Sequence, residues 1–97
     1  MIRHVALFRW RDDVTADDIA AVVAALGAMA ATVPEIRDYR HGPDLGLGAP
    51  RWDYAVVADF DDEAGWQAYD RHPEHARVRS DVIGPLAEER ASVQLDL

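Results

Sequence analysis

The residues best suited to acid–base chemistry gather in one short stretch, from Gln67 to His75. Tyr69, His72 and His75 stand three residues apart, and Pro73 separates the two histidines. Proline cannot continue a helix that precedes it, so one helix is expected to end near His72 and another to begin at Pro73. Such a break can direct several polar side chains toward one point. The sequence therefore predicts a polar pocket at this break.

Two of these residues are candidates for catalysis. His75 could act as a general base, because an unperturbed imidazole titrates at about pH 6.5. Tyr69 could then orient a carbonyl group or donate a hydrogen bond to a developing enolate. Two alternatives remain open at this point. The pair could bind a ligand without chemistry, or the two side chains could hydrogen-bond each other and hold the helix break in place.

Five further residues complete the candidate site or lie near it. His72 is expected to cap the second helical segment and is also a candidate ligand-binding residue. His4 alternates onto the same strand face as Phe8, which is predicted to face the dimer cavity, and Tyr54 is a further candidate ligand-binding residue. The alternative for His4 is a core histidine whose polar atoms are satisfied by neighbours. His41 follows a short strand and precedes Gly42, so it is expected to be solvated.

Composition excludes several kinds of chemistry. The 97 residues form one domain, predicted to span 1–97, and carry a net charge of -8, which argues against binding to nucleic acid or to an anionic membrane. The chain has neither cysteine nor lysine, so disulfides, thiolate metal sites and Schiff-base chemistry are ruled out. We therefore expect no cofactor and no metal, since a nucleotide-binding glycine motif is also missing and His72 and His75 lack metal-site spacing.

The chain shows neither a secretory leader nor an apolar run near the roughly 20 residues of a membrane span, so a cytoplasmic location is expected. Alternating apolar residues and helix-capping signals predict the secondary structure. Thr15 should cap the first helix, which Pro34 ends, and Asp61 or Asp62 should cap the second. The expected strands cover 2–10, 36–41, 52–60 and 88–97, the helical segments 15–33, 62–71 and 73–82, and a loop 42–50.

This order predicts an α+β domain with the ferredoxin-like βαββαβ arrangement, in which an antiparallel four-stranded sheet carries both helices on one face. The other face of the sheet would be left uncovered. We expect a homodimer, because five aromatic residues would otherwise form an exposed apolar patch on that face. They are Phe8, Trp10, Trp52, Tyr54 and Phe60.

Several of these pieces resemble the stress-responsive A/B-barrel (Dabb) domain family, over nearly the whole chain. The resemblance rests on the opening segment 2–8, the strand 53–57 with Phe60, the run Tyr69-x-x-His72-Pro73-x-His75, and Val82, Pro85 and Leu86 after it. It implies a dimeric α+β barrel in which two four-stranded sheets close face to face. A dimeric barrel of this kind also agrees with the uncovered sheet face.

The family includes a cofactor-free polyketide cyclase that performs an intramolecular aldol condensation. The resemblance implies that Tyr69 and His75 match its reacting tyrosine and histidine, and that His4 matches a histidine of the same cavity. The cyclase has a histidine where this chain has Tyr54, so the polar lining differs. Shared fold does not by itself carry the reaction across.

Two functions follow as hypotheses. The first is a homodimer that binds an apolar or aromatic small molecule between sheet and helices. The second is a cofactor-free enzyme of the cyclase, isomerase or lyase type, with Tyr69 and His75 as the acid–base pair. A cofactor-independent oxygenase is a third alternative.

Overall fold

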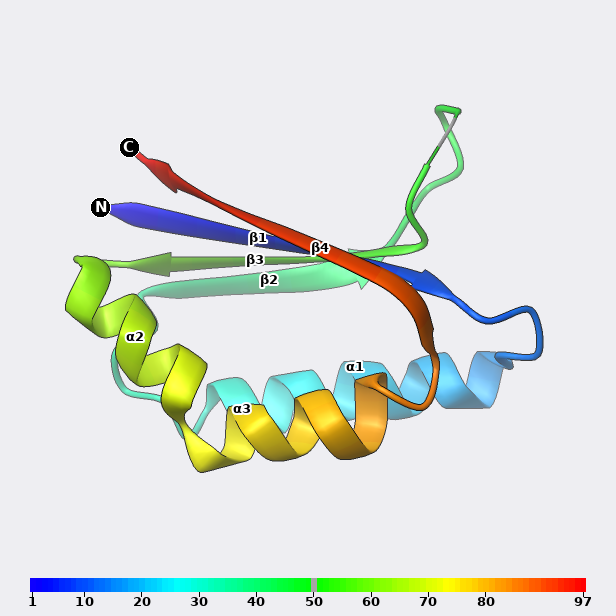
Figure 1. The fold of residues 1–97 in the computed structure, drawn as a ribbon, viewed down its shortest axis with the longest axis horizontal. Helices are drawn as coiled ribbons and strands as arrows, with labels where there is room; N and C mark the ends of the chain where they lie inside the picture. The colour runs from blue at the N-terminus through cyan, green and yellow to red at the C-terminus, as the bar shows by residue number, and fades with distance from the viewer. Residues whose placement is uncertain (50) are drawn as a thin grey trace.

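The structure is a computed structural model and describes residues 1–49 and 51–97. Four strands and four helical segments follow one another along the chain (Figure 1). The strands are β1 (Ile2–Trp10), β2 (Asp38–Pro43), β3 (Tyr54–Phe60) and β4 (Ala87–Asp96), and the helical segments are α1 (Ala16–Ala30), α2 (Glu63–Arg71), α3 (Pro73–Arg77) and the π-helix η1 (Val78–Ile83). Within these residues, every helix is too short or too polar to span a bilayer.

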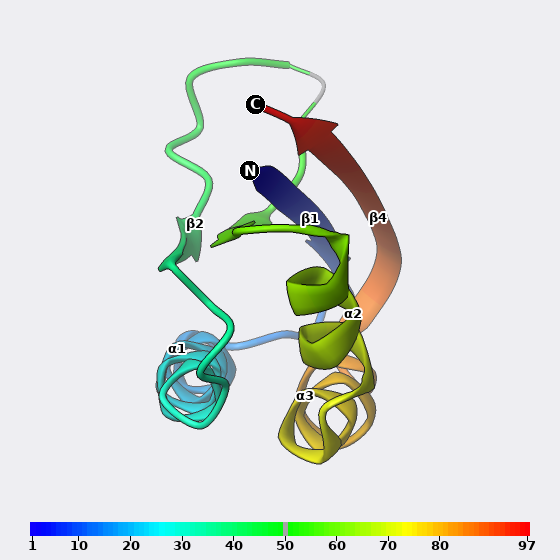
Figure 2. The ribbon, with the colours of Figure 1, turned by 90° about the vertical axis from the view of Figure 1, so that its left-hand side faces the viewer.

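The strands form one antiparallel sheet in the order β2-β3-β1-β4, and all the helices lie on the same face of it (Figure 2). The α+β, ferredoxin-like prediction is confirmed. The described residues between β2 and β3 lie on the opposite side of the sheet from the helices (Figure 1). β4 is an edge strand and is exposed along nearly its whole length, because the helices lie mainly beneath the other three strands.

The predicted start of the first helix is confirmed by its capping interactions. The Thr15 hydroxyl accepts a hydrogen bond from the backbone of Asp18, and the Asp18 carboxylate accepts one from the backbone of Thr15. The helix ends at Ala30, before the predicted end at residue 33. β2 continues through Pro43, which an edge strand tolerates because its outer N–H groups need no partner. The predicted loop 42–50 therefore begins later, and Pro50 lies outside the described residues.

The helix break is also confirmed. α2 ends at Arg71, His72 is extended, and Pro73 opens α3. His72 Nδ1 accepts a hydrogen bond of 3.1 Å from the backbone N–H of Glu74, so this histidine caps α3 as expected. The sequence did not predict that the helix would then widen into the π-helix η1, a form that is common at functional sites.

The prediction of which residues occupy the uncovered sheet face was wrong. Three of the five aromatic residues are buried between the sheet and the helices, namely Phe8, Tyr54 and Phe60. Trp10 stacks on Phe8 with ring centroids 5.7 Å apart, and only Trp52 lies toward the uncovered face, under the guanidinium of Arg9. Strand alternation defines two sets of side chains but does not say which set the helices cover.

The uncovered face, called the outer face below, carries smaller apolar side chains at its centre. They come from three strands, with Val5 in register with Val57 and Val93, and Leu7 in register with Ala55; Leu95 lies two residues beyond Val93 on the same face. Phe8, Tyr54 and Phe60 instead belong to the core between the sheet and the helices. The outer face is therefore still an apolar surface that a second subunit could cover, as the dimer hypothesis requires, but other residues form it.

Candidate functional site

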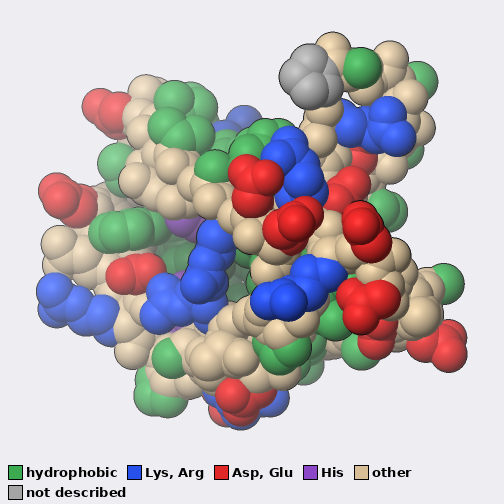
Figure 3. Space-filling view, turned by 45° about the vertical axis from the view of Figure 1, so that its right-hand side comes forward, with side chains coloured by type: hydrophobic (Ala, Val, Ile, Leu, Met, Phe, Trp, Pro, Cys, Tyr) green, Lys and Arg blue, Asp and Glu red, His purple; other side chains and the backbone are tan. Residues whose placement is uncertain are grey.

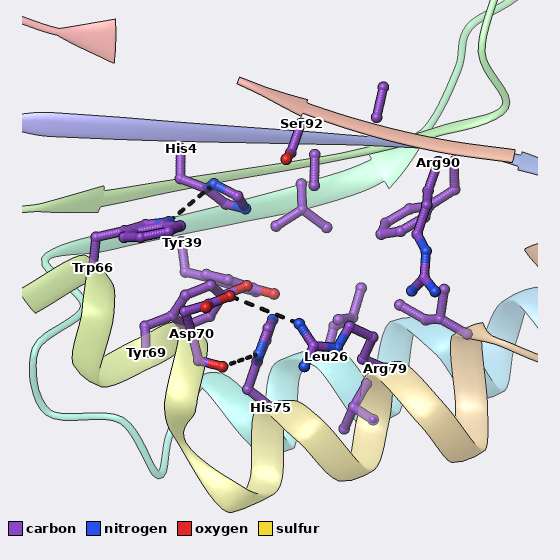
Figure 4. Close-up of a pocket in the computed structure, with 16 residues that line it drawn as sticks. His4, Leu26, Tyr39, Trp66, Tyr69, Asp70, His75, Arg79, Arg90 and Ser92 are labelled. Carbon is purple, nitrogen blue, oxygen red and sulfur yellow. Dashed lines mark hydrogen bonds and ion pairs between the residues drawn. The ribbon is translucent and has the colours of Figure 1, made fainter. Parts of the chain in front are cut away.

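A cavity of about 390 Å³ lies between the inner face of the sheet and the segment from α2 to η1. Its apolar wall consists of Ala6, Phe8, Leu26, Val56, Val78 and Ile83. Polar side chains come from β1, β2, β4 and both sides of the helix break, and Figure 4 shows them converging on this space. Of the three residues singled out first, Tyr69 and His75 line this cavity and His72 does not, while His4 lines it from β1.

His4 projects from the centre of β1 and is buried, with 8% of its surface exposed. Its Nδ1 atom accepts hydrogen bonds from Trp66 Nε1 at 3.2 Å and from the Gln94 amide at 2.9 Å. Because an indole N–H can only donate, Nδ1 must be unprotonated and Nε2 must carry the proton. Burial lowers the pKa of His4, and the nearby charge of His75 lowers it further. His4 therefore presents a neutral ring with an N–H donor.

His75 lies one turn beyond the helix break, and its proton is on the other ring nitrogen from that of His4. Its Nδ1 lies 3.2 Å from the backbone carbonyl oxygen of Asp70, which can only accept, so Nδ1 carries the proton. The lone pair of Nε2 is left facing the cavity (Figure 4). Burial lowers the pKa of His75, although the bond to the Asp70 carbonyl opposes this. At neutral pH His75 is thus an unprotonated base.

Tyr69 and Tyr39 bring two phenol groups to the same space. The Tyr69 ring lies 4.3 Å from the His75 ring and 5.8 Å from the His4 ring, measured between centroids. The Tyr39 hydroxyl is buried and makes no hydrogen bond of standard geometry with any described residue, although the Tyr69 phenol beside it interacts with it and adds to the rise that burial causes in its pKa. Burial raises the pKa of both phenols, so both stay protonated at neutral pH. A buried hydroxyl without a partner costs about 1–3 kcal/mol, which a bound oxygen atom would recover.

The structural alternative for Tyr69 and His75 takes a different form from the one expected. In the described part of the chain the two rings are in contact but share no hydrogen bond of standard geometry. His75 instead holds the break together through the Asp70 carbonyl, across the end of α2. The residue therefore has a structural bond on one nitrogen and a free base on the other.

The cavity opens beside β4, where no helix covers the strand. Arg90 and Ser92 reach toward it from β4, and Asp70 and Arg79 face them from the helical side (Figure 4). Asp70 and Arg79 form an ion pair of 3.7 Å. In Figure 3, arginine side chains lie on both sides of a hollow with a hydrophobic floor.

The remaining predicted site residues have other positions. Phe8 lines the cavity, whereas the capping residue His72 does not. Tyr54 lies outside this cavity as well, and its hydroxyl forms a 2.7 Å hydrogen bond with His41 Nδ1. The expectation that His41 is merely solvated was wrong, because its ring is half-buried and burial lowers its pKa.

Sequence reasoning missed several residues that shape the site. Tyr39 and Gln94 lie on other strands than His4. Their place beside the cavity follows from the strand register, which the sequence alone does not provide. Trp66 could have been found, because it stands three residues before Tyr69 and shares its helix face. Within residues 1–49 and 51–97, no group of three or more histidine or carboxylate side chains is arranged to hold a metal ion.

The fold and the cavity define a small ferredoxin-like α+β protein with a mixed apolar and polar pocket on the helical side of its sheet. The chain belongs to the family "Stress responsive A/B Barrel Domain" (Dabb), whose profile matches residues 2–96. The resemblance seen in the sequence is thereby confirmed. Among functionally curated proteins, no sequence matches this chain significantly.

Solved structures with the same fold include proteins of known and unknown function. A dimeric ferredoxin-like protein of unknown function from Thermobifida fusca is 47% identical, with a TM-score of 0.91, and the match covers 99% of this chain and 90% of that one. A dimeric protein of unknown function from Bacteroides fragilis is 28% identical, with a TM-score of 0.82 and coverages of 99% and 95%. A hydroxynitrile lyase from Passiflora edulis is 19% identical, with a TM-score of 0.86 and coverages of 99% and 92%, which shows a shared fold alone.

The buried histidines predict a pH-dependent stability. Burial lowers the pKa of His4, His41 and His75 below the ordinary value of 6.5. Near and below that pH the unfolded chain therefore binds more protons at these histidines than the folded chain does. The free energy of unfolding should therefore fall as the pH drops from neutral to about 5, as urea titrations would measure. The lowered pKa of Asp59 acts only near and below 3.8 and leaves this window unaffected. A flat profile between these pH values would contradict the neutral assignment of the histidines.

Proposed function

We propose that the protein is a homodimer that binds an apolar or aromatic small molecule bearing a polar oxygen in the cavity of each subunit. The observation that carries this proposal is a set of polar atoms that face the apolar wall of the cavity without a hydrogen bond of standard geometry: the Tyr39 hydroxyl, the His4 Nε2–H and the His75 Nε2 lone pair. Together they offer donors and one acceptor to a single oxygen-bearing group. The apolar wall would hold the rest of the molecule.

The homodimer is supported by the outer face of the sheet. Val93 and Leu95 are 51% and 47% exposed there, and Leu45 and Leu47 of the loop that rises beyond that face are 83% and 89% exposed. So much exposed apolar surface indicates a protein interface. The 47%-identical protein from Thermobifida fusca is described as dimeric, which supports the same assembly here.

The outer face also carries a charge pair that suits a covered surface. The Arg3 guanidinium bonds both oxygens of Asp59, at 2.8 and 2.9 Å, and its side chain lies over the carboxylate. Arg3 thereby lowers the pKa of Asp59, so the carboxylate stays ionised and its negative charge is balanced by the guanidinium. A second sheet could then cover this part of the face without leaving an unpaired charge.

A second candidate function is cofactor-free proton-transfer catalysis of the cyclase or lyase type. The geometry of His75 favours it, because one nitrogen is fixed by the backbone and the other is an unprotonated base directed into the cavity. Tyr69, Tyr39 and His4 would supply protons or hydrogen bonds to the oxygen of an enolate. We retain binding as the first proposal, since it requires only the cavity and its polar lining.

The binding proposal is tested with N-phenyl-1-naphthylamine, a neutral aromatic probe whose fluorescence rises in apolar surroundings. Wild-type protein should bind it with saturable affinity. Ser92 is paired with Ala6 of the neighbouring strand β1, and both line the cavity. Ser92→Phe places a phenyl ring at the cavity opening and should weaken binding about tenfold or more.

Ser80→Phe is the matched control, because Ser80 is exposed on η1 and does not line the cavity. It should bind the probe as the wild type does. Equal binding by Ser92→Phe and wild type would place the probe elsewhere, for instance on the outer face, and would refute the cavity as the binding site. Circular dichroism checks that both variants keep the fold.

A further inference from the structure

The opening of the cavity carries more positive than negative charge, although the chain as a whole is strongly acidic. Of the residues that line the cavity, Asp70 is negative and Arg79 and Arg90 are positive, so their sum is one positive charge once the histidines are neutral. The net charge of the chain is -8. An anion approaching the protein would be repelled over most of its surface and attracted at this opening.

The two arginines differ in how they are paired. Arg79 has Asp70 as an ion-pair partner, at the long distance of 3.7 Å. Arg90 makes neither an ion pair nor a side-chain hydrogen bond with any described residue. The next pair along the two strands is Arg9 and Glu89, and these two side chains form an ion pair of 2.7 Å. The side chain of Glu89 is thus paired with Arg9, on the other face of the sheet. The guanidinium of Arg90 is left free at the cavity opening (Figure 4).

From this arrangement we propose that the ligand is an organic anion, with an apolar or aromatic body in the cavity and a carboxylate or similar group at the opening, held by Arg90 and assisted by Arg79. This rests on the proposed function and specifies the class of its ligand. A guanidinium can bond both oxygens of such a group, and these charge-assisted hydrogen bonds are stronger than neutral ones. The polar oxygen contacted by Tyr39 and the histidines would lie at the other end of the molecule.

Two probes with the same ring system separate charge from shape. 1-Anilinonaphthalene-8-sulfonate is N-phenyl-1-naphthylamine with an added sulfonate, so only the first carries the anion. Arg90→Gln should weaken binding of the sulfonate probe about tenfold and change binding of the neutral probe by less than about twofold. Arg90→Lys, which keeps the charge, should retain more of the affinity for the sulfonate than Arg90→Gln does. Asp70→Asn removes the competing carboxylate and should strengthen sulfonate binding.

Arg11→Gln is the matched control, because Arg11 is exposed, lies outside the cavity and its replacement changes the net charge by the same amount. It should leave both affinities unchanged. The inference is overturned if Arg90→Gln leaves the sulfonate probe unaffected, if it weakens both probes equally, or if Arg11→Gln has the same effect. If the neutral probe still binds in the cavity in these cases, the proposed binding function stands without the anion. If neither probe binds to wild type, both proposals fall.

Discussion

Val93→Glu is expected to convert the homodimer into a monomer at micromolar concentration. Val93 is in register with Val5, which is in register with Val57, so the three form an apolar row across the middle of the outer face. A carboxylate placed there would have to lose its water in the dimer without gaining a partner. Twofold symmetry would introduce the charge twice in one interface, so the dimer should weaken by about 100-fold or more. Light scattering coupled to size-exclusion chromatography measures the change.

Val23→Glu provides the matched control for this experiment. Val23 is 43% exposed, close to the exposure of Val93, but it lies on α1, on the helical side of the sheet. The same substitution there should leave the dimer intact. A Val93→Glu variant that remained dimeric would show that the sheets do not meet through the outer face. A wild-type protein that was monomeric and folded would remove the dimer proposal altogether.

The second large effect is expected at His75, if the protein is an enzyme. His75→Ala should abolish turnover of a poly-β-carbonyl substrate, by about 10²–10⁴-fold, because it removes the base whose Nε2 faces the cavity. Tyr69→Phe keeps the ring contact with His75 and removes only the hydroxyl, so it should lower turnover more than it lowers stability. Product formation is measured alongside binding of the neutral naphthylamine probe, which both variants should retain.

His75→Asn separates catalysis from the structural bond of this residue. The asparagine amide can still donate to the Asp70 carbonyl, as His75 Nδ1 does, but it has no base at the position of Nε2. His75→Asn should therefore melt within about 5 °C of the wild type while lacking turnover. If His75→Asn and wild type were equally active, or if the wild type turned over none of a series of poly-β-carbonyl compounds, the enzyme hypothesis should be abandoned in favour of binding.

Much of the candidate site could be found from residue types and spacing. Pro73 marks the helix break without any tertiary information, because proline cannot continue the helix before it and readily begins the next. Tyr69 and His75 on either side of that break were bound to lie close together. The capping of α1 by Thr15 was equally local, since the bonds to Asp18 close within one turn. Interactions between residues near in sequence are those that a sequence pattern can predict.

The sequence by itself thus determined the order of the elements, the helix break and the family resemblance. Only the tertiary structure decided which face of the sheet the helices cover, because the alternation of β1 offers Phe8 and Leu7 to opposite sides without ranking them. It also decided the proton positions of His4, which depend on Trp66 and Gln94, far away along the chain. The free guanidinium of Arg90 has the same origin, since strand register placed Glu89 beside Arg9 on the other face. These features depend on register and packing between distant segments, which no local pattern specifies.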